Sequence, residues 1–152
     1  MPWKGGYWAG WRFKTNPMSG NFFIDGAIPP NLITGFLQTG CGAHSIFLGQ
    51  VRDESGTVTA IDYTAYEDMA LDKMHEIRET IFARHPLTCL HVYHSLGRVA
   101  AGEISLFVLA SAPHRRAAID ACAETVEAIK ASLPVWGREI LEQGQSRWKW
   151  ST

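Results

Sequence analysis

Residues 104–116 read ISLFVLASAPHRR and join an apolar run directly to a helix start. Residues 104–110 are apolar enough to form a strand buried on both faces. The residues Ile119, Cys122, Val126, Ile129 and Leu133 then recur at spacings of three and four, which predicts an amphipathic helix. Ser111 is the expected cap and Pro113 suits the first turn. The sequence therefore predicts a buried strand that leads into a long helix.

The start of this helix has the composition of an anion site. Backbone N–H groups at a helix N-terminus attract phosphate, and here they would lie beside His114 and Arg115. The Arg115 guanidinium offers a planar fork of donors, and His114 donates a hydrogen bond or carries a proton near neutral pH. These residues predict a phosphate or carboxylate site. A solvated polar turn is the alternative that the same residues allow.

The remaining pattern mixes strands and helices. A short apolar run lies at 22–24, and a brief helix is expected at 32–38. Residues 45–52 and 58–66 are strand candidates on either side of a turn at 53–56, which predicts a hairpin. Apolar residues at helical spacing predict a helix from Ala70 to Phe82 that stops before Pro86. A strand is expected at 89–96 and a connection at 97–102.

Length and composition limit the class of protein. The chain has 152 residues, of which 46% are hydrophobic and 19% charged, with a net charge of −1, and this suits one compact domain and not a protein that coats nucleic acid. The cysteines Cys41, Cys89 and Cys122 lack CxxC spacing, so neither a disulfide framework nor a zinc knuckle is expected. No run approaches a transmembrane span and no signal core is evident, so a cytoplasmic protein is expected.

The histidines, one cysteine and the N-terminal segment are weaker candidates for a site. His91 and His94 lie three apart on a predicted strand and should face opposite sides, which makes them a poor metal pair. Cys122 lies on the apolar stripe of its helix and is expected in the core. Residues 1–20 interleave Trp and Gly without a period and form either an extension that docks its aromatic side chains or a flexible tail.

Several motifs occur together in one order along the chain. They are FLGQVR at 47–52, a strand end at Tyr66, the strand and helix start at 104–116, and Lys130 before PVWGRE at 134–139. In this combination the chain resembles the large, catalytic subunit of molybdopterin synthase over about residues 21–150. The resemblance implies an α+β fold of the α/β-hammerhead type. It has an antiparallel or mixed sheet with packed helices, in a single domain at 21–152 after the extension at 1–20.

The same resemblance implies a sulfurtransferase of molybdenum cofactor biosynthesis. In that family a small ubiquitin-like subunit carries a thiocarboxylate on its C-terminal glycine and inserts this tail into the large subunit. The sulfur acceptor is cyclic pyranopterin monophosphate, which becomes the dithiolene molybdopterin. Two large subunits form a homodimer within a heterotetramer, and no metal or other cofactor takes part.

The resemblance also assigns residues. Its arginine falls on Arg52, with Gln50 and Val51 beside it lining the pocket, and its His-Arg pair falls on His114 and Arg115. Arg52, His114 and Arg115 suit a grip on the substrate phosphate. Lys130 matches the family's helix-end lysine and is, with Arg52, the catalytic candidate. Its ammonium either stabilises developing negative charge or, when neutral, acts as a base or nucleophile. Arg138 and Glu139, from the motif at 134–139, complete the substrate-binding set.

Distance along the helix separates two of these groups. His114 and Lys130 are sixteen residues apart, or about 24 Å at the rise of an α-helix. One small substrate does not span that distance. We therefore expect a composite site, in which His114 and Arg115 of one protomer face Lys130 of the other.

One position departs from the family pattern. The family has a second lysine after the tryptophan of the motif, where this chain has Gly137. Three interpretations follow: compensation by Arg138 or a nearby cation, weakened activity, or a paralogue that binds the ubiquitin-like tail or a phosphorylated small molecule without catalysis. Because the other site residues are present, reduced or compensated activity is favoured over complete loss.

Overall fold

The computed structural model describes residues 22–31 and 39–149. The expectations for residues 1–20 and for the helix at 32–38 lie outside these residues. The elements follow in the order β1 (Phe23–Asp25), β2 (Ala43–Gln50), β3 (Val58–Ala65), α1 (Glu67–Arg84), β4 (Cys89–Ala100), β5 (Ile104–Ala112), α2 (Arg115–Ser132), β6 (Val135–Leu141) and β7 (Ser146–Trp148). A short 3-10 turn at Glu142–Gly144 joins β6 to β7.

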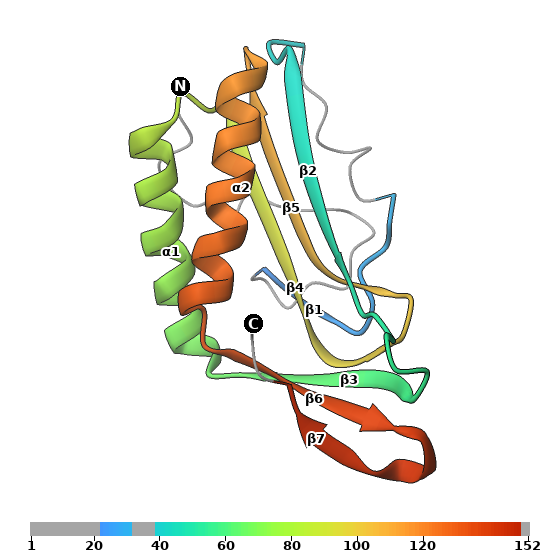
Figure 1. Cartoon of the computed structure of the whole chain (residues 1–152). Coiled ribbons are helices and arrows are strands. Elements are labelled where there is room, and N and C mark those ends of the chain that lie inside the picture. The colour runs from blue at the N-terminus through green and yellow to red at the C-terminus, as the bar shows by residue number, and fades with distance from the viewer. Residues whose placement is uncertain (1–21, 32–38, 150–152) are drawn as a thin grey trace.

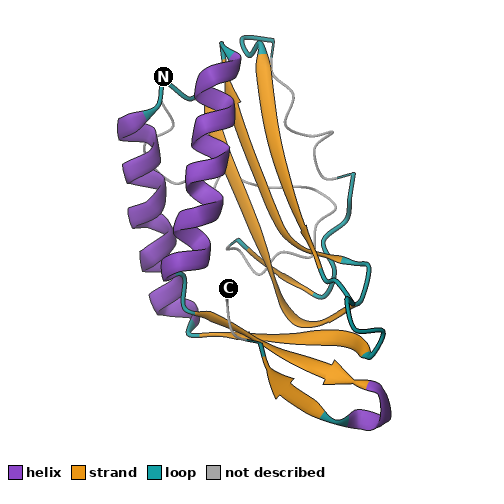
Figure 2. Ribbon diagram, viewed as in Figure 1, coloured by secondary structure: helices purple, strands orange, loops and turns teal. Residues whose placement is uncertain are grey.

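The strands form one mixed sheet with the helices on one side. Its order is β2-β5-β4-β3-β6-β7, and β1 runs parallel to β4 while every other pairing is antiparallel. Both helices lie side by side on the same face of β2, β5 and β4, whereas β3, β6 and β7 extend across the end of that layer (Figure 1). The two-layer arrangement of helices and strands is equally plain in Figure 2. The α+β prediction with a mixed sheet is confirmed.

Strand β5 is the centre of the core, as its apolar sequence predicts. Every residue from Ser105 to Ala112 is buried, because β2 and β4 flank the strand and α2 covers one face. Most of the predicted stripe of α2 is buried, and Cys122 is 5% exposed, so its prediction as a core residue is confirmed. Ile119, which the same stripe includes, is instead 52% exposed. Neither described helix is both long and apolar enough to cross a membrane.

The predicted hairpin of residues 45–66 is wrong. β2 pairs with β5, and β3 pairs with β4 and β6, so the two strands are not neighbours. The Asp53 carboxylate accepts the backbone N–H groups of Thr57 and Val58, each at 3.0 Å, and this turn directs the chain away from β2. β2 instead pairs along its whole length with the buried, mostly apolar β5, which the turn sequence alone does not reveal.

Two predicted boundaries also differ from the structure. The connection expected at 97–102 is mostly strand, because β4 continues to Ala100 and uses its second half to pair with β3. Ser111 does not cap α2, since it belongs to β5 and its hydroxyl shares a 2.6 Å hydrogen bond with His44 Nδ1. The N-cap is His114, without a side-chain cap.

Candidate active site

A cavity of about 480 Å³ lies where the C-terminal end of α2 meets the sheet. It is lined from β2, β3, β4, α2 and β6 and by the residue after β7. Its polar side chains include Gln50, Arg52, Tyr63, His94, Lys130 and Lys149. Segments far apart in the sequence therefore build one site at the junction of the helical layer with β3, β6 and β7.

Lys130 lies in the last turn of α2, next to the buried stripe of that helix. Its position at a helix C-terminus favours a positive charge. Partial desolvation, and then the charge of Lys149, nevertheless hold the pKa of Lys130 below its ordinary value. An ammonium under these conditions gains stability when an anion enters the cavity, and it gives up its proton more readily than an ordinary lysine.

Arg52 lies at the mouth of the cavity, just after β2. Its guanidinium forms a 3.0 Å ion pair with Glu54, and both side chains are largely exposed, so this contact holds the arginine only weakly. Gln50 also lines the cavity, whereas Val51 is buried against Ile61 and Val99. Arg52 and Gln50 therefore face the cavity, and the structure places Val51 behind it as packing.

Tyr63 and His94 form the inner wall of the cavity, and sequence reasoning did not select either for the site. Their rings meet edge to face at 5.3 Å, and the Tyr63 hydroxyl donates to Ser105 Oγ at 3.1 Å. His94 Nδ1–H donates to the Ser95 carbonyl at 2.8 Å. Burial, with a smaller effect from Lys130, lowers the pKa of His94 to about 4, so its ring is neutral at pH 7. Burial raises the pKa of Tyr63.

His114 and Arg115 lie at the opposite end of α2 from this cavity. The helix is continuous from Arg115 to Ser132, so the separation of about 24 Å from Lys130 applies within one chain. Both residues are exposed, and neither lines the cavity. The structure thus brings together Gln50, Arg52 and Lys130, and leaves the His-Arg pair apart from them.

Arg138 does not lean into the space beside Gly137. Alternation along β6 turns it to the other face of the sheet, where its guanidinium lies 3.6 Å from the Asp62 carboxylate. Glu139 faces a smaller concavity that it shares with Arg52 and Lys149, but its carboxylate is held at 2.5 Å by Arg147. Of the two motif residues assigned to substrate binding, only Glu139 is therefore on the cavity side.

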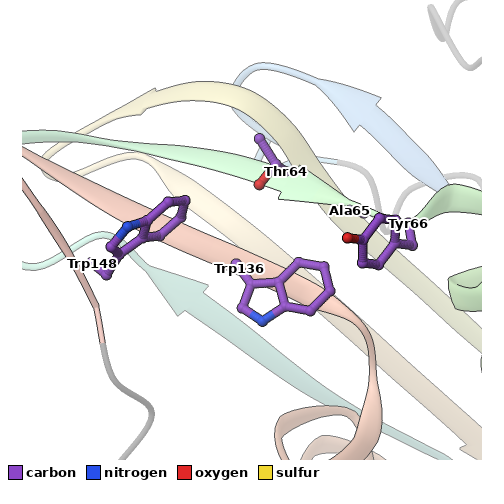
Figure 3. A pocket seen from close by; sticks show the side chains of 5 residues that line it. All are labelled: Thr64, Ala65, Tyr66, Trp136 and Trp148. Atoms are coloured by element: carbon purple, nitrogen blue, oxygen red, sulfur yellow. The ribbon is translucent and has the colours of Figure 1, made fainter.

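The opposite face of the same strands carries an aromatic cleft. Figure 3 shows Trp136 and Trp148 beside Thr64, Ala65 and Tyr66. The Tyr66 and Trp136 rings meet edge to face at 5.1 Å. The described residues that line this cleft include no ionisable group apart from the Tyr66 phenol, so they lack the cations that the Lys130 cavity offers to an anion. Among the described residues, no cluster of three or more His, Cys, Asp or Glu side chains is arranged to hold a metal.

Comparison with known proteins decides the family. The model of the MoaE protein family matches residues 28–132. The chain belongs to the MoaE family. The curated relative from Pyrococcus abyssi, named molybdopterin synthase catalytic subunit, is 40% identical over 106 residues, which cover 68% of this chain and 72% of that protein. The relative of the same name from Drosophila mojavensis is also 40% identical, but only 32% of its length is matched.

Solved structures of MoaE-type proteins agree with this fold. The crystal structure of molybdopterin synthase from Staphylococcus aureus superimposes with a TM-score of 0.77 at 29% identity, over 84% of this chain and 95% of that one. As a MoaE chain, the protein combines the expected Arg52 and Lys130 in one cavity. Tyr63, His94 and Lys149 were missed because each reaches the cavity through sheet pairing, which leaves no local signal in the sequence.

Proposed function

We propose that the Lys130 cavity is the site at which this chain transfers sulfur to a phosphorylated pterin, as the catalytic subunit of molybdopterin synthase. The observation that carries the proposal is the cavity itself, in which Lys130 and Arg52 meet in a chain of the MoaE family. The donor is the thiocarboxylated C-terminal glycine of a small ubiquitin-like subunit. The acceptor is cyclic pyranopterin monophosphate, and the reaction takes place in the cytoplasm.

Each polar residue of the cavity has a role that follows from its chemistry. The donor tail and the acceptor both carry negative charge, which Arg52 and Lys130 attract. Lys130 touches the reacting groups, and its lowered pKa suits either a charge-stabilising ammonium or a proton acceptor. Gln50 offers an amide that orients the reactants. Tyr63 and His94 close the inner wall and exclude water.

A second copy of the chain supplies the phosphate grip in this proposal. β2 is the edge of the described sheet, paired only with β5, and its Ile46 and Leu48 side chains are 41% and 43% exposed. The first residue of β2 pairs with Ala112, close to His114, and its last residue, Gln50, lines the cavity. Antiparallel pairing of two β2 edges would therefore place His114 and Arg115 of one copy beside the cavity of the other.

The test is single-turnover incubation of the chain with thiocarboxylated small subunit and cyclic pyranopterin monophosphate, followed by detection of the dithiolene. The wild-type chain is expected to form product, and Lys130→Ala to slow the transfer by about 100-fold or more. Lys73→Ala is the matched control, because Lys73 is a half-exposed lysine of α1 that is paired with Glu76 and does not line the cavity, so the substitution should have no effect on transfer. Equal rates for the two variants would remove Lys130 from the mechanism.

The competing proposal is a paralogue that binds the ubiquitin-like tail without catalysis, and Gly137 is the observation that favours it. The named relatives support the catalytic subunit instead. A stable complex with the small subunit that yields no dithiolene in the same assay would establish the paralogue.

A further inference from the structure

Gly137 leaves one wall of the cavity without a side chain. It lies on β6 directly opposite Tyr63 of β3. A Cβ atom at this position would lie 3.0 Å from Ile61 Cγ2 and 3.4 Å from Tyr63 Cε1. A side chain at 137 would therefore fit only if the Ile61 methyl group and the Tyr63 ring shifted slightly. With glycine at this position, a cation on this wall comes from another strand.

The neighbouring strand brings a lysine to this place. β6 and β7 pair Arg138 with Trp148 and Glu139 with Arg147, and one more step of this register sets Lys149 opposite Gly137. The Lys149 backbone N–H donates to the Gly137 carbonyl at 2.9 Å, which fixes the step. Directly opposed residues of an antiparallel pair point to the same face, with Cβ positions about 5 Å apart. Both residues accordingly line the Lys130 cavity.

The ammonium of Lys149 is available to a ligand. Glu139, which shares the smaller concavity with Lys149, is engaged with Arg147, and Glu127 lines the Lys130 cavity from α2. No ion pair within the described residues includes Lys149. Lys149 also acts on the site electrostatically, since its charge contributes to the lowered pKa of Lys130. Two like charges held toward one cavity repel each other, and a bound anion relieves this repulsion.

We propose that Lys149 supplies the second ammonium group of the Lys130 cavity, from the strand opposite Gly137, and binds an anionic group of the reactants there. A lysine delivered by β7 takes the place of one on β6. The anion is either the thiocarboxylate of the donor tail or the phosphate of the acceptor. Lys149 has this role in turnover only if the cavity carries out the proposed sulfur transfer, so its test needs a binding measurement beside the rate.

The experiment compares Lys149→Met, Lys149→Arg and the control Lys73→Met in the full chain. Lys149→Met is expected to lower the single-turnover rate at least 10-fold, whereas Lys149→Arg, which keeps the charge, stays within about threefold of wild type. Removing the charge of Lys149 also raises the pKa of Lys130, so the limb of the pH–rate profile that reports Lys130 moves to higher pH. A merely structural role for Lys149 would not move that limb. Thermal melting of all three variants checks that each keeps the fold.

Binding measurements identify the anion and separate this proposal from the proposed function. Titration with small subunit ending in a free carboxylate tests the tail, and titration with inorganic phosphate tests the acceptor. A weaker dissociation constant for either probe in Lys149→Met, but not in Lys73→Met, supports the role of Lys149 and names its ligand. If the wild type forms no dithiolene, the proposed function fails while these titrations still decide on Lys149. The proposal would be overturned if Lys149→Met had a single-turnover rate and both dissociation constants within twofold of wild type and an unshifted pH–rate profile.

Discussion

At the scale of single residues, the cavity is lined by cationic side chains and by neutral rings that are largely buried. Lys130, Lys149 and Arg52 face a wall made by Tyr63 and His94. The rings remain uncharged at pH 7, because burial shifts the pKa of His94 downward and that of Tyr63 upward. Among the described residues that line the cavity, the three cations outnumber one carboxylate, Glu127, so the lining keeps a net positive charge that incoming anions neutralise.

The buried histidines make the protein sensitive to acid. His94 has a pKa of about 4 and His91 one of about 2 in the folded chain, against an ordinary value of 6.5. Between pH 6.5 and the folded values the unfolded chain binds more protons, so stability is complete above pH 6.5 and falls as the pH drops. Each histidine is expected to lower the free energy of unfolding by about 2 kcal/mol between pH 7 and pH 5.

Urea unfolding at pH 7 and pH 5 measures this effect. Glutamine at position 94 cannot take up a proton, so in His94→Gln only His91 lowers the free energy of unfolding on acidification. The loss between pH 7 and pH 5 should therefore be smaller by about 2 kcal/mol than in the wild type. An unchanged loss in His94→Gln would show that His94 titrates normally in the folded protein.

At the scale of elements, the junction of β5 with α2 fixes where His114 and Arg115 lie. The segment before β2 packs tightly here: a Cβ atom on Gly42 would lie 2.4 Å from the Pro113 carbonyl oxygen. Gly42 also donates its backbone N–H to the Ala112 carbonyl at 3.1 Å. The start of α2 is thereby tied to the start of the edge strand β2.

Gly42→Ala tests this junction. The added methyl group forces a shift of backbone, and we expect a loss of about 1–3 kcal/mol in the free energy of unfolding. Gly40→Ala is the matched control, since a Cβ atom there meets nothing within 4 Å. Chemical denaturation of both variants gives the comparison, and equal stabilities would mean that the close approach relaxes freely.

Local pattern predicted the elements better than their pairing. The apolar run of β5 and the helix α2 lie where the sequence pattern predicts them, although Ile119 of the predicted apolar stripe is exposed. The predicted hairpin was wrong, because strand periodicity indicates which face of a strand is buried but not which strand lies beside it. The position of Lys149 in the cavity could not be predicted for the same reason, since its place opposite Gly137 depends on the register of β6 with β7.

At the scale of the whole molecule, the site requires more than one chain in this account. A continuous α2 separates His114 from Lys130, and the exposed β2 edge offers a surface through which a second copy would close the gap. The family resemblance supplied the residues of both parts of this site, His114 with Arg115 and Arg52 with Lys130. The structure adds that only one of the two, the Lys130 end, belongs to a cavity of the single chain.

Mixed dimers test the composite site. Lys130→Ala and His114→Ala proteins are each expected to be strongly impaired, and refolding them together should restore about a quarter to a half of wild-type activity, because one of the two cavities in a mixed dimer is intact. The activity of the mixture in single turnover, beside each variant alone, is the measurement. No recovery in dimers shown to be mixed would contradict a site built from His114 of one copy and Lys130 of the other.

The central claim is that this chain transfers sulfur although position 137 holds glycine. The most direct measurement follows the wild-type chain in one turnover and records two quantities together, the intact mass of the small subunit and the dithiolene formed on the pterin. We expect oxygen to replace sulfur on the small subunit in step with dithiolene formation. Loss of sulfur without dithiolene, or an unchanged thiocarboxylate in a formed complex, would contradict it.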